Sequence, residues 1–160
     1  MSDYMTATLV LPTFALDLVA IQEALDREGR PNEESRASDG TATLIWAEAA
    51  YGEVPGVENA LATLGIAFDR HSDASYDYSA ESRVFRPDTE QSATCDVTIY
   101  TLGNHRPVIT LFQLEELAKA GVLTIEAIRT HLGLPSETVA EWAAKHDAAA
   151  FCGVQEEMPS

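Results

Sequence analysis

The stretch that decides the fold runs from Thr41 to Pro87 and reads TATLIWAEAAYGEVPGVENALATLGIAFDRHSDASYDYSAESRVFRP. Its first part, Thr41–Ala47, is rich in β-branched and large apolar residues and follows a turn signal, which predicts a strand. Apolar residues then recur at helical spacing over Val57–Leu64, and Gly65 can adopt the left-handed conformation of a helix end. Two more strands are predicted after this helix: Ile66–His71 and Ser82–Pro87.

The residues before this stretch predict one more strand and one more helix. Met5–Leu11, reading MTATLVL, is predicted to be a strand that Pro12 closes, and Thr13 is a suitable N-cap for a helix that Gly29 ends. The polar run Arg27–Asp39 has no apolar periodicity and is predicted to be an exposed loop.

Within the opening stretch, the serine-rich segment Ser72–Glu81 is predicted to be a long loop. After Pro87 the chain changes from strand to helix. Thr94–Leu102 alternates apolar and polar side chains, as a half-buried strand does. Three helices are expected beyond it, one from Phe112, one capped by Thr124 and one over Glu137–Ala149 with Ser136 as its N-cap.

The predicted fold class is α+β, with a small mixed or antiparallel sheet, helices on one face and a C-terminal helical cluster. We expect one compact domain, since 160 residues with 46% hydrophobic content suffice for one core. Within it, residues 1–104 form the sheet part, residues 105–154 the helical cluster, and residues 155–160 a polar tail.

Acidity is the unusual property of the composition. The chain has 10 Lys and Arg residues against 26 Asp and Glu residues, a formal net charge of −16. Such a field repels nucleic acid and anionic membrane surfaces and favours basic partners. We therefore expect no direct binding to nucleic acid or membranes.

Neither cysteine nor histidine usage indicates a metal site or a cofactor. Cys95 and Cys152 have no metal-ligand spacing, and the histidines are scattered. The run Asp69–Asp77 spaces polar groups two apart but lacks the glycine and the glutamate of a calcium loop. Without a signal peptide or a long apolar run, a cytoplasmic location is expected.

The segment Ile128–Trp142, reading IRTHLGLPSETVAEW, resembles a helix-turn-helix unit. In that resemblance Leu132-Gly133-Leu134 forms the turn, and Trp142 packs against Ile128 and Leu132. The second helix would offer Glu137, Thr138, Glu141 and Lys145 to a DNA groove, and its carboxylates repel phosphate.

Two sets of residues are candidate binding sites, and no catalytic motif is present. The first set holds acids predicted to be exposed in loops and on helix faces: Glu33, Glu34, Asp73, Asp77, Glu137 and Glu141. The second set crowds the ends of two predicted strands and mixes acids, bases and aromatic rings: Trp46, Glu48, Tyr51, Glu53, Arg70 and His71.

Three classes of function remain open from the sequence. The leading hypothesis is a non-enzymatic binding or inhibitory protein whose acidic surface engages a basic protein partner, with nucleic-acid mimicry as a special case. The second is a DNA-binding regulator acting through Ile128–Lys145. The third is a small enzyme that uses Glu48, Glu53, Arg70 and His71 for acid/base chemistry.

Overall fold

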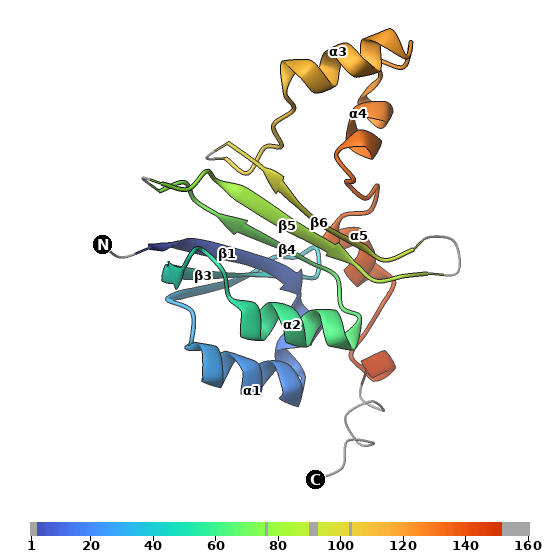
Figure 1. The fold of residues 1–160 in the computed structure, drawn as a ribbon. Coiled ribbons are helices and arrows are strands. Elements are labelled where there is room, and N and C mark those ends of the chain that lie inside the picture. Colours follow the sequence, from blue (N-terminus) through green and yellow to red (C-terminus); the bar gives the residue numbers. More distant parts are fainter. Residues whose placement is uncertain (1–2, 76, 90–92, 103, 152–160) are drawn as a thin grey trace.

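A six-stranded sheet organises the computed structural model, which describes residues 3–75, 77–89, 93–102 and 104–151 (Figure 1). The strands lie in the order β2-β3-β1-β4-β5-β6, and every neighbouring pair is antiparallel. Their bounds are β1 Tyr4–Pro12, β2 Glu33–Arg36, β3 Thr41–Ala50, β4 Phe68–Ser72, β5 Glu81–Arg86 and β6 Cys95–Tyr100. Because β3 lies between β1 and β2, and β1 between β3 and β4, the helical connections form two interleaved split βαβ units.

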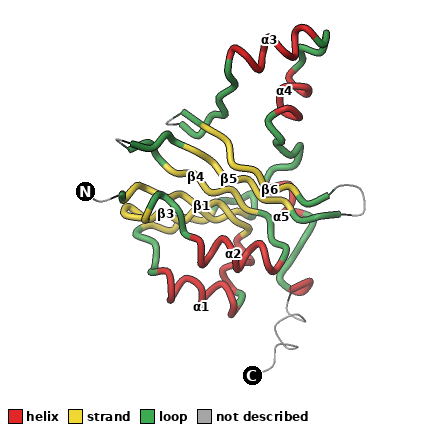
Figure 2. The backbone as a smooth tube through the Cα atoms, viewed as in Figure 1, coloured by secondary structure: helices red, strands yellow, loops and turns green. Residues whose placement is uncertain are grey.

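The two crossover helices, α1 (Val19–Glu28) and α2 (Pro55–Leu64), pack side by side on one face of the sheet (Figures 1 and 2). Leu9 on β1 pairs with Leu44 on β3, so their side chains point to the same face and are fully buried there. The helices contribute Ile21, Leu25, Val57 and Leu61 to this core. The predicted α+β architecture, with an antiparallel sheet and helices on one face, is confirmed.

Two details near the N-terminus differ from the prediction. The helix does not start at Thr13: residues Thr13–Asp17 form a short 3-10 helix, η1, and α1 begins only at Val19. Thr13 is not an N-cap, because η1 is preceded by Pro12 and α1 by Leu18 at the cap position. The backbone N–H of Thr13 donates to the carbonyl of Gly40 at 2.8 Å, which ties η1 to the start of β3.

The predicted loop Arg27–Asp39 also contains a strand. Glu33–Arg36 pairs with β3 as the edge strand β2, and all four of its residues are exposed. An edge strand with both faces in solvent needs no apolar pattern, and charged side chains there discourage pairing with another chain. Hydrophobic periodicity therefore gives no signal for it.

The chain is helical from Leu111 onward in the described residues, as expected, but the helices are short: α3 Leu111–Lys119, α4 Ile125–His131 and α5 Val139–Ala144. The predicted third helix over Glu137–Ala149 starts later, because Thr138 and Glu141 form a capping box that places the first turn at Val139. It ends sooner, because the chain turns back to place the Phe151 ring 6.1 Å from the ring of Trp142.

The expected burial of Trp142 is confirmed, but its neighbours differ from those predicted. Its ring lies 4.0 Å from His146, 6.2 Å from Phe14 and 6.1 Å from Phe151, and it belongs to the main core. Ile128 and Leu132 stay half-buried outside that core. A seven-residue connection, 132–138, separates α4 from α5, longer than the turn of a helix-turn-helix unit.

The helices α3 and α4 stand away from the sheet as a hairpin (Figures 1 and 2). They contact each other, while α5 packs on β1 and β3. In the part of the chain that the structure describes, no helix combines the length and the apolar character that a bilayer crossing requires.

Candidate functional site

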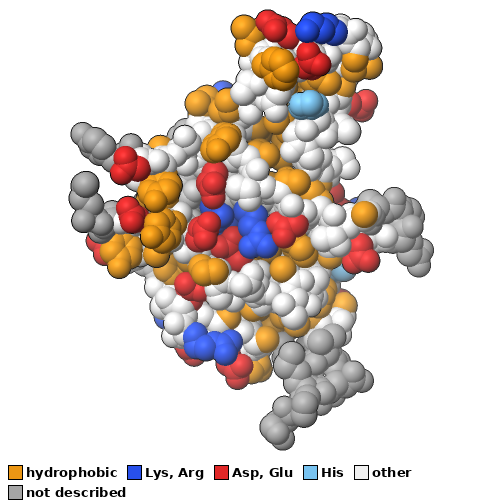
Figure 3. Space-filling view, in the orientation of Figure 1, with side chains coloured by type: hydrophobic (Ala, Val, Ile, Leu, Met, Phe, Trp, Pro, Cys, Tyr) orange, Lys and Arg blue, Asp and Glu red, His pale blue; other side chains and the backbone are white. Residues whose placement is uncertain are grey.

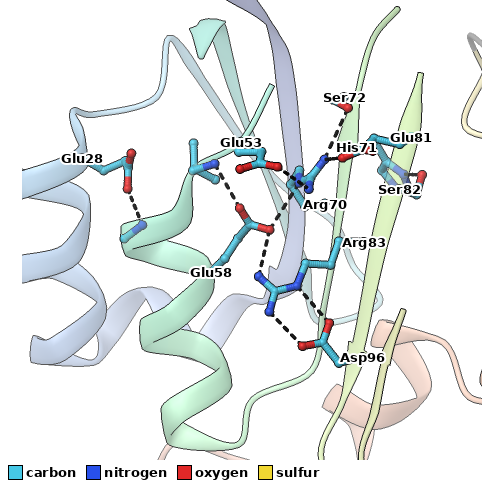
Figure 4. A network of polar contacts seen from close by, with 12 residues as sticks. Glu28, Glu53, Glu58, Arg70, His71, Ser72, Glu81, Ser82, Arg83 and Asp96 are labelled. Atoms are coloured by element: carbon cyan, nitrogen blue, oxygen red, sulfur yellow. Dashed lines mark hydrogen bonds and ion pairs between the residues drawn. The ribbon is translucent and has the colours of Figure 1, made fainter. Parts of the chain in front are cut away.

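A buried carboxylate, that of Glu58, lies at the centre of a charge network between α2 and the sheet (Figure 4). One of its oxygens accepts hydrogen bonds from Arg70 Nε at 3.3 Å and from Arg83 at 3.4 Å. Its other oxygen accepts one from the backbone N–H of Val54 at 3.0 Å. Burying a charge is costly unless it is paired and hydrogen-bonded, and here both conditions hold. The network fixes α2 on β4 and β5.

The two arginines of the network also bind carboxylates nearer the surface. Arg70 reaches Glu81 at 3.1 Å and Glu53 at 3.9 Å, and Arg83 binds both oxygens of Asp96, at 3.0 and 2.9 Å. Two guanidinium groups therefore face four carboxylates, counting Glu58. Figure 3 shows the result, basic side chains enclosed by acidic ones at the centre of the visible face. The site as a whole carries negative charge.

An open hollow of about 530 Å³ lies where this network reaches the end of the sheet. Its size falls in the range of ordinary ligand pockets. Three tyrosines and three carboxylates line it, and we call these six residues the tyrosine end: Tyr51, Glu53, Asp77, Tyr78, Glu81 and Tyr100. The three tyrosine side chains are 51%, 41% and 68% exposed, so their rings are accessible to a partner.

The backbone holds Tyr51 in an unusual conformation. Its φ of +55° lies in the left-handed region that side-chain-bearing residues rarely adopt, and Gly52 follows at +67°. A Cβ at position 52 would collide with the Ser72 side chain, so the turn after β3 must press closely on the end of β4. This turn places the Tyr51 ring edge-on to Tyr78, with 5.8 Å between ring centroids.

The electrostatic potential at the tyrosine end is negative. The pKa of Tyr78 is raised above its usual value, chiefly by the charge of Asp3 and in smaller part by burial, Tyr51 and Asp77. The same field that disfavours a tyrosinate favours a bound cation. Figure 3 shows acidic and hydrophobic side chains next to each other at the left of the view, the side on which Figure 1 marks the N-terminus.

The structure brings together most of the second predicted set. Four of its residues line a neighbouring hollow of about 340 Å³: Trp46, Glu48, Tyr51 and Glu53. Arg70 joins them through Glu53, but His71 does not. Because side chains alternate along β4, the side chains of His71 and its partner Thr8 lie on the opposite face from those of Arg70 and Leu9. The predicted group of Glu48, Glu53, Arg70 and His71 is therefore divided between two faces of the sheet.

The six acids of the first predicted set lie in three separate places. Glu33 and Glu34 are on the edge strand β2, and Asp73 and Asp77 are in the connection from β4 to β5. Glu137 and Glu141 lie at the start of α5, where Glu141 caps the helix and Glu137 binds Lys145. Of the six, Asp77 alone is among the residues that line the tyrosine end.

A smaller hollow of about 160 Å³ lies on the opposite face, between the sheet and the segment that leads to α5. His71 contacts Ser82 there through Nδ1, and its ring stacks on His105 at 4.2 Å. Burial, and in smaller part the charge of the neighbouring His105, lowers the pKa of His71 to about 4. His71 is therefore neutral at physiological pH, in a wall that Arg86 and Asp69 close with an ion pair at 2.8 Å.

Sequence reasoning missed the central pair of the network. Glu58 stands beside Val57 and three residues before Leu61, that is, on the apolar side of α2. Arg70 stands between Phe68 and Ser72 at inward positions of β4. An acid on the apolar face of one element and an arginine at an inward position of the next is a readable signal for a buried ion pair. No group of three or more His, Cys, Asp or Glu among the described residues is arranged to hold a metal ion.

Comparison of the chain with protein-family models, with curated proteins and with solved structures gives no match.

Proposed function

We propose that this protein is a non-enzymatic binding protein that engages a basic segment of a protein partner at its tyrosine end. The observation that carries the proposal is the lining of the larger hollow, in which three exposed tyrosine rings stand among three carboxylates. Arginine and lysine are the side chains that such a lining recognises, because a cation is attracted both to a carboxylate and to the face of an aromatic ring.

The protein's own arginine at this site does not oppose a cation. Arg70 is buried, and its charge is compensated by Glu58, Glu81 and Glu53. Glu53 and Asp77 are exposed at the rim, where a partner can reach them. Tyrosine is also enriched at the centres of protein interfaces, since its ring buries a large area with little loss of conformational entropy.

The charge of the whole chain supports the same class of partner. A net charge of −16 steers a basic segment toward the protein and accelerates association. Mimicry of nucleic acid requires carboxylates in a row at the spacing of phosphates, about 7 Å. The six predicted acids are divided among three places and do not form one such row, so nucleic-acid mimicry is not part of the proposal.

The experiment measures binding of short fluorescein-labelled peptides by fluorescence anisotropy. An Arg-Gly repeat and a Lys-Gly repeat should bind, and a Glu-Gly repeat should not. Removing two aromatic rings in Tyr78→Ala with Tyr100→Ala should raise the Kd by about tenfold or more without changing any charge. Removing two rim charges in Glu53→Gln with Asp77→Asn should have a similar effect.

The matched control is Glu33→Gln with Glu34→Gln, which removes two charges from the exposed strand β2. Its effect on the Kd should stay within about twofold, because charges beyond the Debye length of about 8 Å are screened. Equal weakening by both charge variants would mean that the diffuse field, and not the tyrosine end, holds the peptide. Absence of binding to either basic peptide would overturn the proposal altogether.

A further inference from the structure

Besides the tyrosine end, a second exposed surface is the helical hairpin of residues 108–132, which we call the arm. It contains α3, α4 and their connection, and it extends away from the sheet (Figures 1 and 2). Several large apolar side chains on it are exposed to solvent: Leu111 71%, Phe112 68%, Val122 45%, Leu123 57% and Ile125 74%. Exposed apolar side chains that gather on one element mark an interaction surface.

The arm does not bury enough of itself to be stable alone. All of its residues are described, and among those in α3 and α4 only Leu117 is buried. The helices have 9 and 7 residues. Isolated helices shorter than about 12 residues are marginal in water, and helices gain most of their stability from packing of an apolar face. The exposed apolar side chains of the arm therefore need a further surface to pack against.

The distribution of charge indicates which partner would supply the surface that packs on the arm. The arm holds two basic and three acidic residues, a net of −1, whereas the remaining residues hold 8 and 23, a net of −15. A basic partner has little reason to bind the nearly neutral arm. A second copy of this chain, repelled by the strong negative field everywhere else, meets the least repulsion there.

The positions of the apolar side chains fit such a copy. Leu111 and Phe112 lie at the first turn of α3, and Val122, Leu123 and Ile125 lie just beyond its last turn. The two groups are separated by the length of the helix, about 14 Å for nine residues. When two arms lie antiparallel, the first group of each copy meets the second group of the other, and the same contact forms twice around one two-fold axis.

We propose that the protein forms a homodimer through antiparallel packing of its arms, α3 against α3, with Phe112 of each copy against Val122–Ile125 of the other. The dimer is independent of the binding activity proposed above, and it presents two tyrosine ends to a partner that carries two basic segments.

The experiment is the solution mass of the full chain, measured by light scattering and analytical ultracentrifugation over about 1 to 100 µM. Wild-type protein should have the mass of a dimer, which should persist at 1 M salt because apolar contacts are not screened. Phe112→Ser with Ile125→Ser should be monomeric. Val19→Ser is the matched control, since Val19 is 59% exposed on α1 and outside the arm, and it should remain dimeric.

A charge-swap pair tests the antiparallel arrangement. Phe112→Glu and Ile125→Lys should each be monomeric alone, and a mixture of the two should form a heterodimer, because position 112 of one copy meets position 125 of the other. Near-ultraviolet circular dichroism verifies that each variant keeps its fold, since both tryptophans lie in the main core. A monomeric wild type at 100 µM, or a dimer that survives the double serine variant, would overturn the proposal. Loss of peptide binding by a dimeric protein would overturn only the proposed function.

Discussion

Glu58 on α2 and Arg70 on β4 form an ion pair at 3.3 Å in which both side chains are almost completely buried. The pair joins the second crossover helix to the strand that follows it in the chain, and the same Arg70 reaches the carboxylates at the rim of the tyrosine end. The core and the candidate site therefore share one residue. A change that disturbs the pair will be felt in both.

Replacing Glu58 by leucine should lower the free energy of unfolding by about 3–5 kcal/mol, because it leaves the buried guanidinium of Arg70 without its buried counter-charge. The double variant Glu58→Leu with Arg70→Leu should lose less than the single one, since neither charge then remains in the core. Urea denaturation followed by circular dichroism measures both. If the double variant is the less stable of the two, the pair is not coupled in this way.

Trp142→Ala should cost about 3–5 kcal/mol of stability, the usual range for a buried large aromatic side chain. The reason is its position among the rings of Phe14, His146 and Phe151. Phe151→Ala should be destabilising as well, whereas the exposed-site control Val19→Ala should stay within about 0.5 kcal/mol. Thermal and urea unfolding provide the comparison. Near-native stability of the Trp142 variant would show that α5 is not anchored by these rings.

The elements that were predictable from the sequence are those whose apolar pattern faces the core. The strand from Thr41 and the helix closed by Gly65 were identified because their periodicity and their punctuation agree. Strand β2 was missed because both of its faces are in solvent, so burial imposes no pattern on its residues. The length of the connection between α4 and α5 was also not predictable, because the spacing of glycine, valine and tryptophan does not show where each helix begins and ends.

The candidate site was only partly predictable. The crowding of Tyr51 and Glu53 after a strand was visible, because the two residues are close in the chain. Tyr100 lies on β6, and the hollow becomes complete only when the sheet order places β5 and β6 beyond β4. The division of Arg70 from His71 could have been predicted, because both residues lie in the predicted strand Ile66–His71 and successive side chains of a strand point to opposite faces.

Stability should fall as the pH is lowered from about 6.5 toward 4, in part through His71. Burial holds the pKa of this histidine at about 4 in the folded protein, whereas its ordinary value, which applies in the unfolded chain, is 6.5. In that window the unfolded chain binds a proton that the folded chain does not, so the contribution of His71 is fully present above pH 6.5 and is lost as the pH falls, by at most about 3 kcal/mol.

The measurement is the difference in unfolding free energy between wild type and His71→Gln at several pH values. This difference should shrink or change sign in favour of the variant between pH 7 and pH 4.5. Val19→Ala is the control, because Val19 is exposed on α1 and has no titratable group, so its difference from wild type should be independent of pH. A constant difference for His71→Gln would mean that this histidine is not kept neutral by the fold.

The protein should have no appreciable affinity for generic double-stranded DNA at about 150 mM salt. Non-specific DNA binding depends on the release of counterions by Lys and Arg side chains, and here 10 such residues are outnumbered by 26 acids. The segment that resembles a helix-turn-helix adds little: Lys145 is bound to Glu137, and Arg129 donates to the carbonyl of Pro135 at 2.9 Å.

Fluorescence anisotropy with a labelled 20-base-pair duplex provides the test, and the Arg-Gly peptide serves as the positive control on the same protein sample. Anisotropy should stay flat for the duplex over the concentrations at which the peptide saturates. Binding of the duplex that weakens steeply with salt would place basic side chains of this chain on phosphates. A DNA-binding regulator would then take precedence over a protein that captures basic segments at its tyrosine end.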